Sequence, residues 1–215
     1  MKKYMRIISI LLLPIAVVPS CKKSSSNSPD RVDYTASIKD KTWWGMLAYT
    51  GKTPEYYSVH FNTNNSLTWS QLSGDYTGHW LLDSRELTIT FDGNSQEIKA
   101  GISDDNQLVS IKDNTAASEI NSGELIVNSN IPLDNTAWTG TIDYPSTKAL
   151  QLDFKPGLQV TINIDKSPVK TYTYTRPSSN PIVRISTIFF GIITSGGKMK
   201  GSVDNAGVIW QATKQ

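Results

Sequence analysis

The chain has 215 residues, of which 21 are Lys or Arg, 19 are Asp or Glu and one is Cys. Its formal charge of +2 becomes −1 without residues 1–20, because that segment holds three basic residues and no acid. A nearly neutral chain gives no electrostatic basis for binding nucleic acid, and a single cysteine excludes a disulfide within the chain.

The amino terminus has the layout of a secretory signal peptide. A positive segment over residues 2–6 precedes an apolar run over residues 7–18, and the small Ser20 closes that run. The run is shorter than the about 20 residues that a helix needs to span a bilayer. We therefore predict that residues 1–20 are a cleaved signal peptide rather than a membrane anchor.

The end of this segment, Val18-Pro19-Ser20-Cys21, resembles the lipobox of bacterial lipoproteins, in which the peptide is cut before a cysteine that then takes lipid. The resemblance implies that Cys21 carries several acyl chains, which hold a protein stably at a membrane. The next residues, KKSS, lack the acids that tend to follow the cysteine of surface-exported lipoproteins in Bacteroidetes-type bacteria. We therefore expect a cell-envelope protein, anchored to the outer membrane and facing the periplasm.

A polar segment separates Cys21 from the folded part. Residues 22–34 are rich in serine and contain Pro29, so they bury too little apolar surface to order themselves. We predict a flexible tether over residues 21–39. Beyond it, short runs alternate apolar and polar residues with the period of a β-strand. The best helix candidate in the mature chain is the short segment Thr115–Ile120.

An internal repeat divides the β-rich part. Trp43 begins the sequence WWGMLAY and Trp138 begins WTGTIDY, so both read W-x-G-x-[LI]-x-Y. In a strand the four shared positions lie on one face, and we expect the two tryptophans to be equivalent core rings. Each copy is followed by an alternating strand that ends in phenylalanine, at Phe61 and Phe154. The pattern indicates a duplicated unit.

Each copy contains seven or eight predicted strands between turns rich in Asn, Asp and Gly, which suits a small antiparallel barrel. The predicted fold class is all-β, with two tandem antiparallel meanders that form small barrels; a single large β-sandwich is the alternative. The run Gly123–Val127 is predicted to add a strand that closes the first unit. The predicted boundaries are residues 1–20 for the signal peptide, 21–39 for the tether, 40–128 for the first barrel and 129–215 for the second.

Three motifs follow one another in the first unit: FNTNNSLTW from Phe61, GHW from Gly78 and ELTITF from Glu86. In this order they resemble the lipocalin-like lipoproteins of Bacteroidetes-type bacteria, over about residues 40–112. The second half, with WTG, YTY and KMKG, is similar to a divergent second copy. The resemblance implies a lipocalin-like meander with an apolar interior and a binding role, and it supplies no catalytic residues.

No catalytic or metal motif is complete. The two histidines, His60 and His79, fall on the outward side of their predicted strands, and zinc needs three or four nitrogen or sulfur ligands. The acidic turns at Asp92 and Asp104 lack the spacing of a calcium loop, and the glycine-rich run at Gly191 departs from a phosphate-binding loop. We therefore predict no metal, no cofactor and no catalytic residue.

Aromatic residues are the remaining signal, with six Trp and nine Tyr in the chain. Most lie on predicted apolar faces and are expected to fill the barrels. Others lie off those faces, where exposed rings stack on sugars or apolar ligands. Two of these tyrosines alternate with threonines in one strand, close to two arginines. The candidate ligand-binding residues are Trp44, Tyr172, Tyr174, Arg176 and Arg184.

The predicted function is a non-enzymatic binding module for a small apolar or glycan-like ligand, held at the membrane through Cys21. One alternative is an accessory lipoprotein that binds another envelope protein, and another is a hydrolase with an unrecognised site. An open, partly apolar cavity in a barrel favours ligand binding, and an exposed apolar patch favours the accessory role. A cleft with two facing carboxylates favours the enzyme.

Overall fold

The computed structural model describes residues 34–115, 118–121, 123–127, 131–143, 145–176, 181–203 and 207–215. By its contacts the chain divides into two units, Met1–Arg31 and Val32–Gln215, and both sheets belong to the second. The predicted signal peptide, the predicted lipidation residue Cys21, most of the predicted tether and Tyr144 lie outside the described residues. In the described part, no helix combines the length and the apolar character needed to cross a bilayer.

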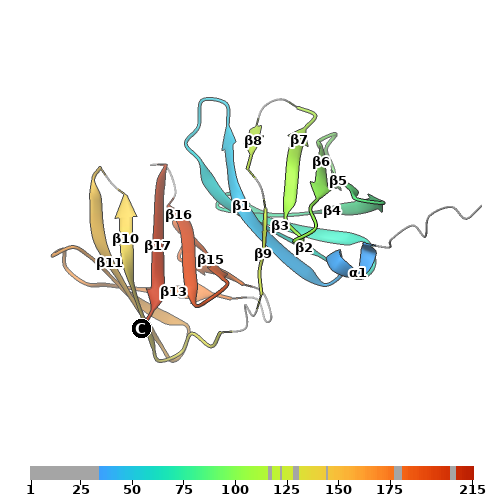
Figure 1. Ribbon diagram of the computed structural model, residues 1–215. Helices are drawn as coiled ribbons and strands as arrows, with labels where there is room; N and C mark the ends of the chain where they lie inside the picture. Colours follow the sequence, from blue (N-terminus) through green and yellow to red (C-terminus); the bar gives the residue numbers. More distant parts are fainter. Residues whose placement is uncertain are drawn as a thin grey trace, which may run out of the picture. The chain divides into compact units, whose positions relative to one another are not determined.

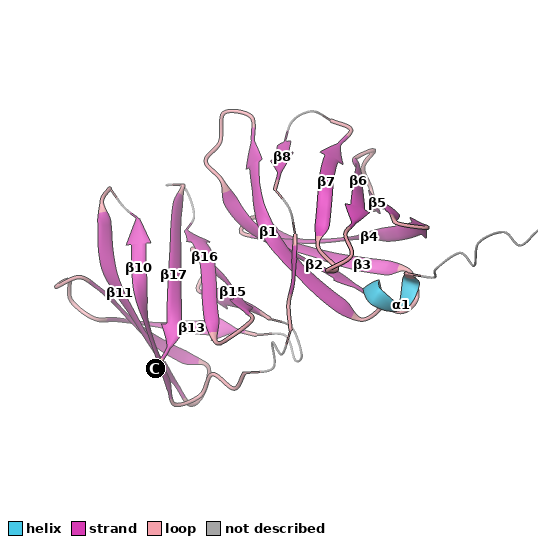
Figure 2. Cartoon of the chain, viewed as in Figure 1, coloured by secondary structure: helices cyan, strands magenta, loops and turns pink. Residues whose placement is uncertain are grey.

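The first sheet is a nine-stranded antiparallel meander preceded by one helical turn (Figures 1 and 2). Its elements are α1 (Thr35–Ile38), β1 (Lys41–Tyr49), β2 (Glu55–Phe61), β3 (Ser66–Gln71), β4 (Gly74–Asp83), β5 (Glu86–Phe91), β6 (Glu97–Ile102), β7 (Leu108–Asp113), β8 (Ser118–Ile120) and β9 (Glu124–Leu125). The strand order is β7-β6-β5-β4-β3-β2-β1-β8, with β9 also paired to β1.

Leu108 and Gly123 join the two ends of this sheet. Each backbone N–H donates to the carbonyl of the other, at N–O distances of 2.8 and 2.9 Å. Because β9 follows Gly123 directly and pairs with β1, these bonds bring the last strands of the meander back to the first. The run Gly123–Val127 was predicted to add a strand that closes the first unit; the strand is there but is limited to Glu124–Leu125, and Gly123 supplies the bridge to β7.

The second sheet is a closed antiparallel barrel, drawn from yellow to red in Figure 1. Its strands are β10 (Thr136–Asp143), β11 (Thr147–Lys155), β12 (Gln159–Ile164), β13 (Lys170–Thr175), β14 (Ile182–Ile185), β15 (Phe189–Thr194), β16 (Lys198–Val203) and β17 (Val208–Lys214). Each strand pairs with the next, and β17 pairs with β10. The predicted fold class of two tandem antiparallel barrels is confirmed, and the alternative of one large sandwich is wrong.

The strand register relates the two barrels residue by residue. Trp43 and Trp138 are both fully buried, and each lies in the first strand of its barrel. In both barrels the residue two places before the tryptophan pairs with a buried phenylalanine of the next strand, Phe61 or Phe154. Because a one-residue slip would turn every side chain to the opposite face, this shared register accounts for the repeated motif.

Two predicted segments differ in the structure. The tether was expected to reach residue 39, yet Thr35–Ile38 forms a helical turn whose Ile38 is fully buried in the first core. Burial of this side chain offsets the entropy of ordering the turn. The helix expected over Thr115–Ile120 is also wrong, because its last three residues form β8 and pair with β1. Pairing at a sheet edge satisfies these backbone groups better than one isolated helical turn would.

Candidate functional site

Strand pairing from the matched tryptophans shows which lining residues of the two barrels correspond. In the first barrel Trp43 pairs with a residue of β2 that in turn pairs with Trp69 of β3. In the second barrel Trp138 is connected in the same way, through β11, to Ile162 of β12. Two residues further along these strands, the first barrel has Gln71 and the second has Ile164. The second barrel therefore has two fully apolar side chains at this end, and Ile162 is much smaller than the corresponding Trp69.

The same correspondence reverses the charge at the rim. Glu55 in the first barrel and Lys148 in the second occupy corresponding positions, because each pairs with the residue four places after the matched tryptophan. Tyr76 pairs with Trp69, and Lys170 takes the corresponding place opposite Ile162. An acid and a tyrosine in the first barrel thus correspond to two lysines in the second.

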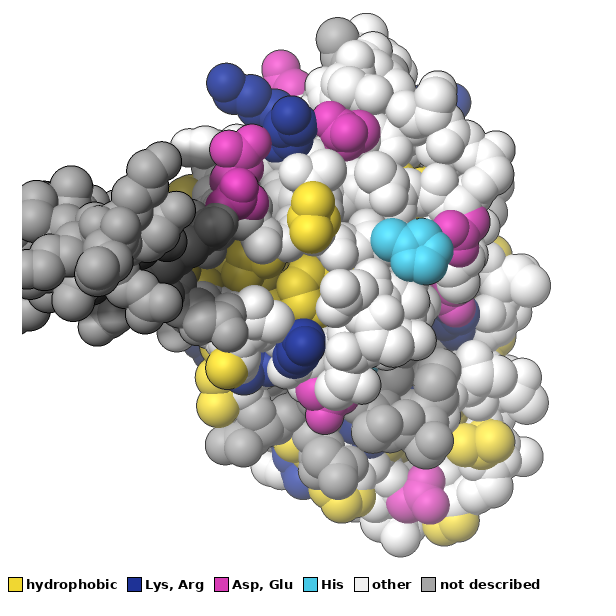
Figure 3. Space-filling view, turned by 90° about the vertical axis from the view of Figure 1, so that its right-hand side faces the viewer, with side chains coloured by type: hydrophobic (Ala, Val, Ile, Leu, Met, Phe, Trp, Pro, Cys, Tyr) yellow, Lys and Arg dark blue, Asp and Glu magenta, His cyan; other side chains and the backbone are white. Residues whose placement is uncertain are grey.

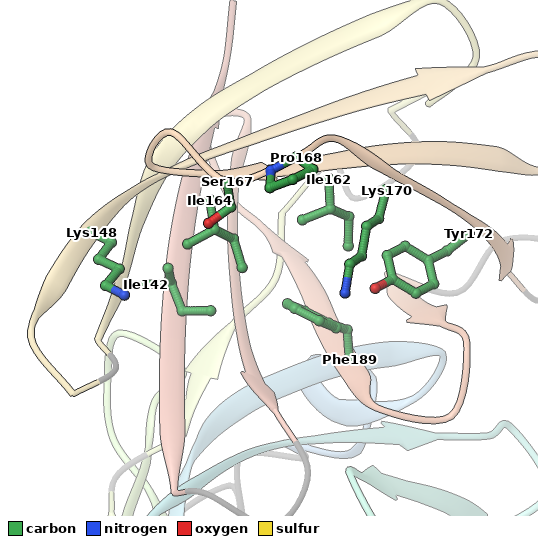
Figure 4. Close-up of a pocket in the computed structure, with 9 residues that line it drawn as sticks. All are labelled: Ile142, Lys148, Ile162, Ile164, Ser167, Pro168, Lys170, Tyr172 and Phe189. Carbon is green, nitrogen blue, oxygen red and sulfur yellow. The ribbon is translucent and has the colours of Figure 1, made fainter.

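A cavity of about 270 Å³ opens at this end of the second barrel (Figure 4). Its deeper wall is apolar, and Ile142, Ile162 and Phe189 are each at most 7% exposed. The polar side chains at the opening come from β11 (Lys148), from the turn between β12 and β13 (Ser167) and from β13 (Lys170 and Tyr172). The full lining is Ile142, Lys148, Ile162, Ile164, Ser167, Pro168, Lys170, Tyr172 and Phe189.

The opposite end of the second barrel is closed by packed rings and by the segment that enters β10. Leu133 is 3% exposed in the same core as Trp138. Phe154 and Tyr174 meet edge to face at 5.1 Å, and the Tyr174 hydroxyl donates to Asp134 Oδ1 at 2.9 Å. Burial, together with this hydrogen bond, raises the pKa of Tyr174 to about 12. The cavity is therefore reached from one end of the barrel.

Trp210 lies next to two residues of the cavity wall, Ile142 and Phe189. It pairs across strands with Ile142, and its ring lies 6.3 Å from that of Phe189. Its indole N–H is buried and has no acceptor among the described residues.

The corresponding end of the first barrel is better filled. Its cavity is about 170 Å³, and Trp69 and Gln71 occupy part of the end. Trp69 stacks on Tyr57 at 4.3 Å, and its indole N–H donates to Gln71 Oε1 at 2.9 Å. The Gln71 amide in turn donates to the Tyr49 hydroxyl at 3.1 Å. These polar groups satisfy one another, so this end offers fewer free contacts to a ligand.

The predicted site residues do not form one site, and two of them are core residues. Trp44 was expected as an exposed ring but is 6% exposed, packed against Tyr56 at 5.9 Å with the Lys200 amine 4.7 Å from its ring centre. Tyr174 was expected at the surface but is 3% exposed inside the second barrel. Alternation in β13 is as predicted, but the tyrosine face is the inner one and the threonine face the outer one.

The two predicted arginines donate hydrogen bonds to backbone carbonyls and do not line the cavity. Arg184 donates to the Gln71 carbonyl at 3.0 Å and to Asp75 Oδ1 at 2.6 Å. Arg176 donates to the Ile131 carbonyl, and burial lowers its pKa. Of the five predicted residues, Tyr172 alone lines the cavity.

The two histidines lie on the outer face, as expected. His60 accepts or donates a hydrogen bond with Thr42 Oγ1 at 2.9 Å, and its Nε2 lies 3.5 Å from Asp40. His79 Nε2 lies 3.5 Å from Asp92. Within the described residues no group of three or more His, Cys, Asp or Glu side chains is placed to hold a metal. Figure 3 shows one face of the molecule, where a histidine adjoins an acid and charges of both signs are interspersed.

Sequence reasoning missed the lysines at the opening. Lys148 continues the inward alternation of Leu150, Leu152 and Phe154, and this spacing was visible in the sequence. A charged residue at the end of an apolar alternation looks like a strand terminus, so the pattern alone does not assign it to a lining position. Only the pairing of Lys148 with Ile142 places it at the opening.

Comparison with known proteins adds no family. The chain matches no protein-family model, and no curated protein matches it either. It is similar to the crystal structure of kievitone hydratase from Nectria haematococca, with 9% identity over 80% of this chain and 87% of that chain and a TM-score of 0.24. A TM-score this low carries no argument about this chain. Its own fold defines a tandem β-barrel protein, and the second barrel has an apolar-walled cavity of about 270 Å³.

Proposed function

We propose that this chain is a lipid-anchored envelope lipoprotein, lipocalin-like in its barrels, whose second barrel binds a small apolar ligand without transforming it. The observation that carries the proposal is the cavity of about 270 Å³, apolar in depth and open at one end. This volume lies just below the range of about 300–1,000 Å³ common for small-molecule sites. The ligand is therefore expected to be small.

The lining supports an apolar ligand over a glycan. Ile142, Ile162, Ile164 and Phe189 supply most of the wall, and the polar groups are confined to the opening. Sugar hydroxyls need several hydrogen-bond partners when they leave water, and this wall has none to offer at depth.

The chemistry of the lining also supports binding over hydrolysis. It contains no histidine and no carboxylate. The pair of carboxyl groups that glycoside hydrolysis uses as acid and base is therefore not found in this lining. The polar groups that are present, two amines and two hydroxyls, suit recognition of a ligand at its polar end.

The anchor and the location rest on the sequence. Cys21 would take the acyl chains, residues 22–33 would separate the membrane from the barrels, and the protein would face the periplasm. Protease shaving of intact cells should then leave the protein uncut, while the same protease added after outer-membrane permeabilisation should cut it. Release of the barrels from intact cells would contradict the periplasmic orientation.

A filled-cavity variant tests the binding function. Ile162→Trp introduces the residue that the first barrel has at the corresponding position, and Ile164→Trp blocks the half-buried mouth instead. Calorimetric titration with 1-octanol should give saturable binding to the wild type and none to either variant. Thr161→Trp, which adds the same ring to the outer face of β12, is the matched control and should bind normally. Absence of octanol binding by the wild type would overturn the proposal, as would unchanged binding by both filled variants that melt like the wild type.

A further inference from the structure

We infer that the ligand of the second barrel is an amphiphile with an anionic head group, held at the opening by Lys148 and Lys170. The inference rests on the proposed function and adds the chemical class of the ligand. Its basis is that two basic side chains occupy lining positions at the mouth of an apolar cavity (Figure 4).

Strand register places both lysines next to the apolar wall. Lys148 is the cross-strand partner of Ile142, and Lys170 is the partner of Ile162. Residues directly opposite in antiparallel strands have Cβ atoms about 4.5–5.5 Å apart. Each amine is therefore carried by a stem that begins beside a buried isoleucine. In Figure 4 the two amines enter the opening from different sides.

Neither amine is neutralised within the described residues. Lys148 and Lys170 take part in none of the ion pairs there. Asp143 and Asp165 each follow a lining isoleucine, but neither lines the cavity. Asp143 instead accepts a hydrogen bond from the Thr147 hydroxyl at 2.8 Å. The lining itself carries two positive charges and no negative one, so it attracts an anion.

Neutral donors accompany the two charges. The Tyr172 hydroxyl has no hydrogen-bond partner among the described residues, and Figure 4 shows it directed toward the same space as the Lys170 amine. Ser167 adds a second hydroxyl at the opening. A carboxylate accepts several hydrogen bonds at once, so it can use both amines and a hydroxyl together.

The first barrel provides an internal comparison. At the positions of Lys148 and Lys170 it has Glu55 and Tyr76, and its smaller cavity is partly filled by Trp69 and Gln71. In the second barrel the positive rim thus accompanies an apolar cavity of about 270 Å³, whereas the corresponding rim positions of the first barrel are Glu55 and Tyr76. This pairing of features is what a site for an anionic amphiphile requires.

The test compares three probes with the same eight-carbon chain and different charge at pH 7: octanoate, 1-octanol and octylammonium. Octanoate should bind the wild type about tenfold more tightly than octanol, because two partly solvated amines each add a modest interaction. Octylammonium should bind more weakly than octanol. Raising the salt concentration should weaken octanoate binding toward that of octanol.

Lysine variants locate the effect. Lys148→Gln and Lys170→Gln should each weaken octanoate binding about threefold relative to octanol binding by the same variant. Lys155→Gln is the matched control, since Lys155 is exposed at the other end of the same strand as Lys148. Equal binding of octanoate and octanol by the wild type would overturn this inference while leaving the proposed function in place. Failure of all three probes would instead overturn the proposed function.

Discussion

Asp40 and Asn135 adopt the same left-handed backbone conformation, with φ of 57° and 59°, three residues before Trp43 and Trp138. Two residues before each of them in the chain lies a buried aliphatic side chain, Ile38 in the first barrel and Leu133 in the second. The duplicated unit therefore begins before the repeated tryptophan motif. In both copies a tight turn brings an apolar residue onto the core just before the first strand.

The shared turn predicts a specific response to substitution at Asn135. Asn135→Ala should lower the free energy of unfolding by about 1–2 kcal/mol, because a side chain with an ordinary Cβ is strained at this φ. Asn135→Gly should stay close to the wild type, since glycine adopts positive φ without a steric cost. Urea unfolding of the three proteins measures the difference. Equal stability of the alanine and glycine variants would show that the turn does not constrain the chain.

The matched tryptophans predict matched losses of stability. Trp43→Ala and Trp138→Ala should each cost on the order of 3–5 kcal/mol, because both rings are fully buried. Leu81→Ala, at a side chain that is 65% exposed, should change the free energy of unfolding by no more than about 0.5 kcal/mol. Denaturant unfolding followed by circular dichroism measures all three. A tryptophan variant that unfolds like the wild type would remove that ring from the core.

The raised pKa of Tyr174 predicts that the free energy of unfolding falls at alkaline pH. Folding raises the pKa of Tyr174 from its usual value near 10 to about 12, so the folded protein holds this proton more tightly than the unfolded chain. The resulting stabilisation is fully present below pH 10 and is lost as the pH rises toward 12. Between pH 8 and pH 11 the loss should be on the order of 1 kcal/mol. Tyr174→Phe should lack this component, and the other tyrosines cancel in the comparison. An identical pH dependence of the two proteins would contradict the shift.

Loss of Cys21 is expected to abolish membrane anchoring without affecting the fold of the barrels. Cys21→Ser should move the protein from the detergent phase to the aqueous phase in a phase-partition assay, because the acyl chains have no other attachment site. The circular dichroism of the barrels should not change. Ser20→Ala keeps a small residue before the cysteine and is the matched control, expected to partition like the wild type. Cys21→Ser protein that stays in the detergent phase would exclude the lipobox.

The fold was more predictable than the site, for a physical reason. Trp43 and Trp138 could be placed in the core because period-two alternation marks which residues share a face. Alternation does not say which face is inner when one carries tyrosine and the other threonine, and the face of Tyr174 was assigned wrongly. Nor does it show that an outer face is covered, as happens at Trp44. Lys148 was missed because its role depends on its pairing with Ile142 across the β10–β11 hairpin and on the apolar wall that the other strands add beside it.

The most direct test of ligand binding in the second barrel is a methyl NMR titration of the isoleucine-labelled protein with octanoate. The account predicts saturable shifts at Ile142, Ile162 and Ile164, which line the cavity. Isoleucines in the core of the first barrel, such as Ile89 and Ile102, should not shift and provide the internal control. Shifts of similar size in both barrels, or no saturable shift at the three lining residues, would contradict the account.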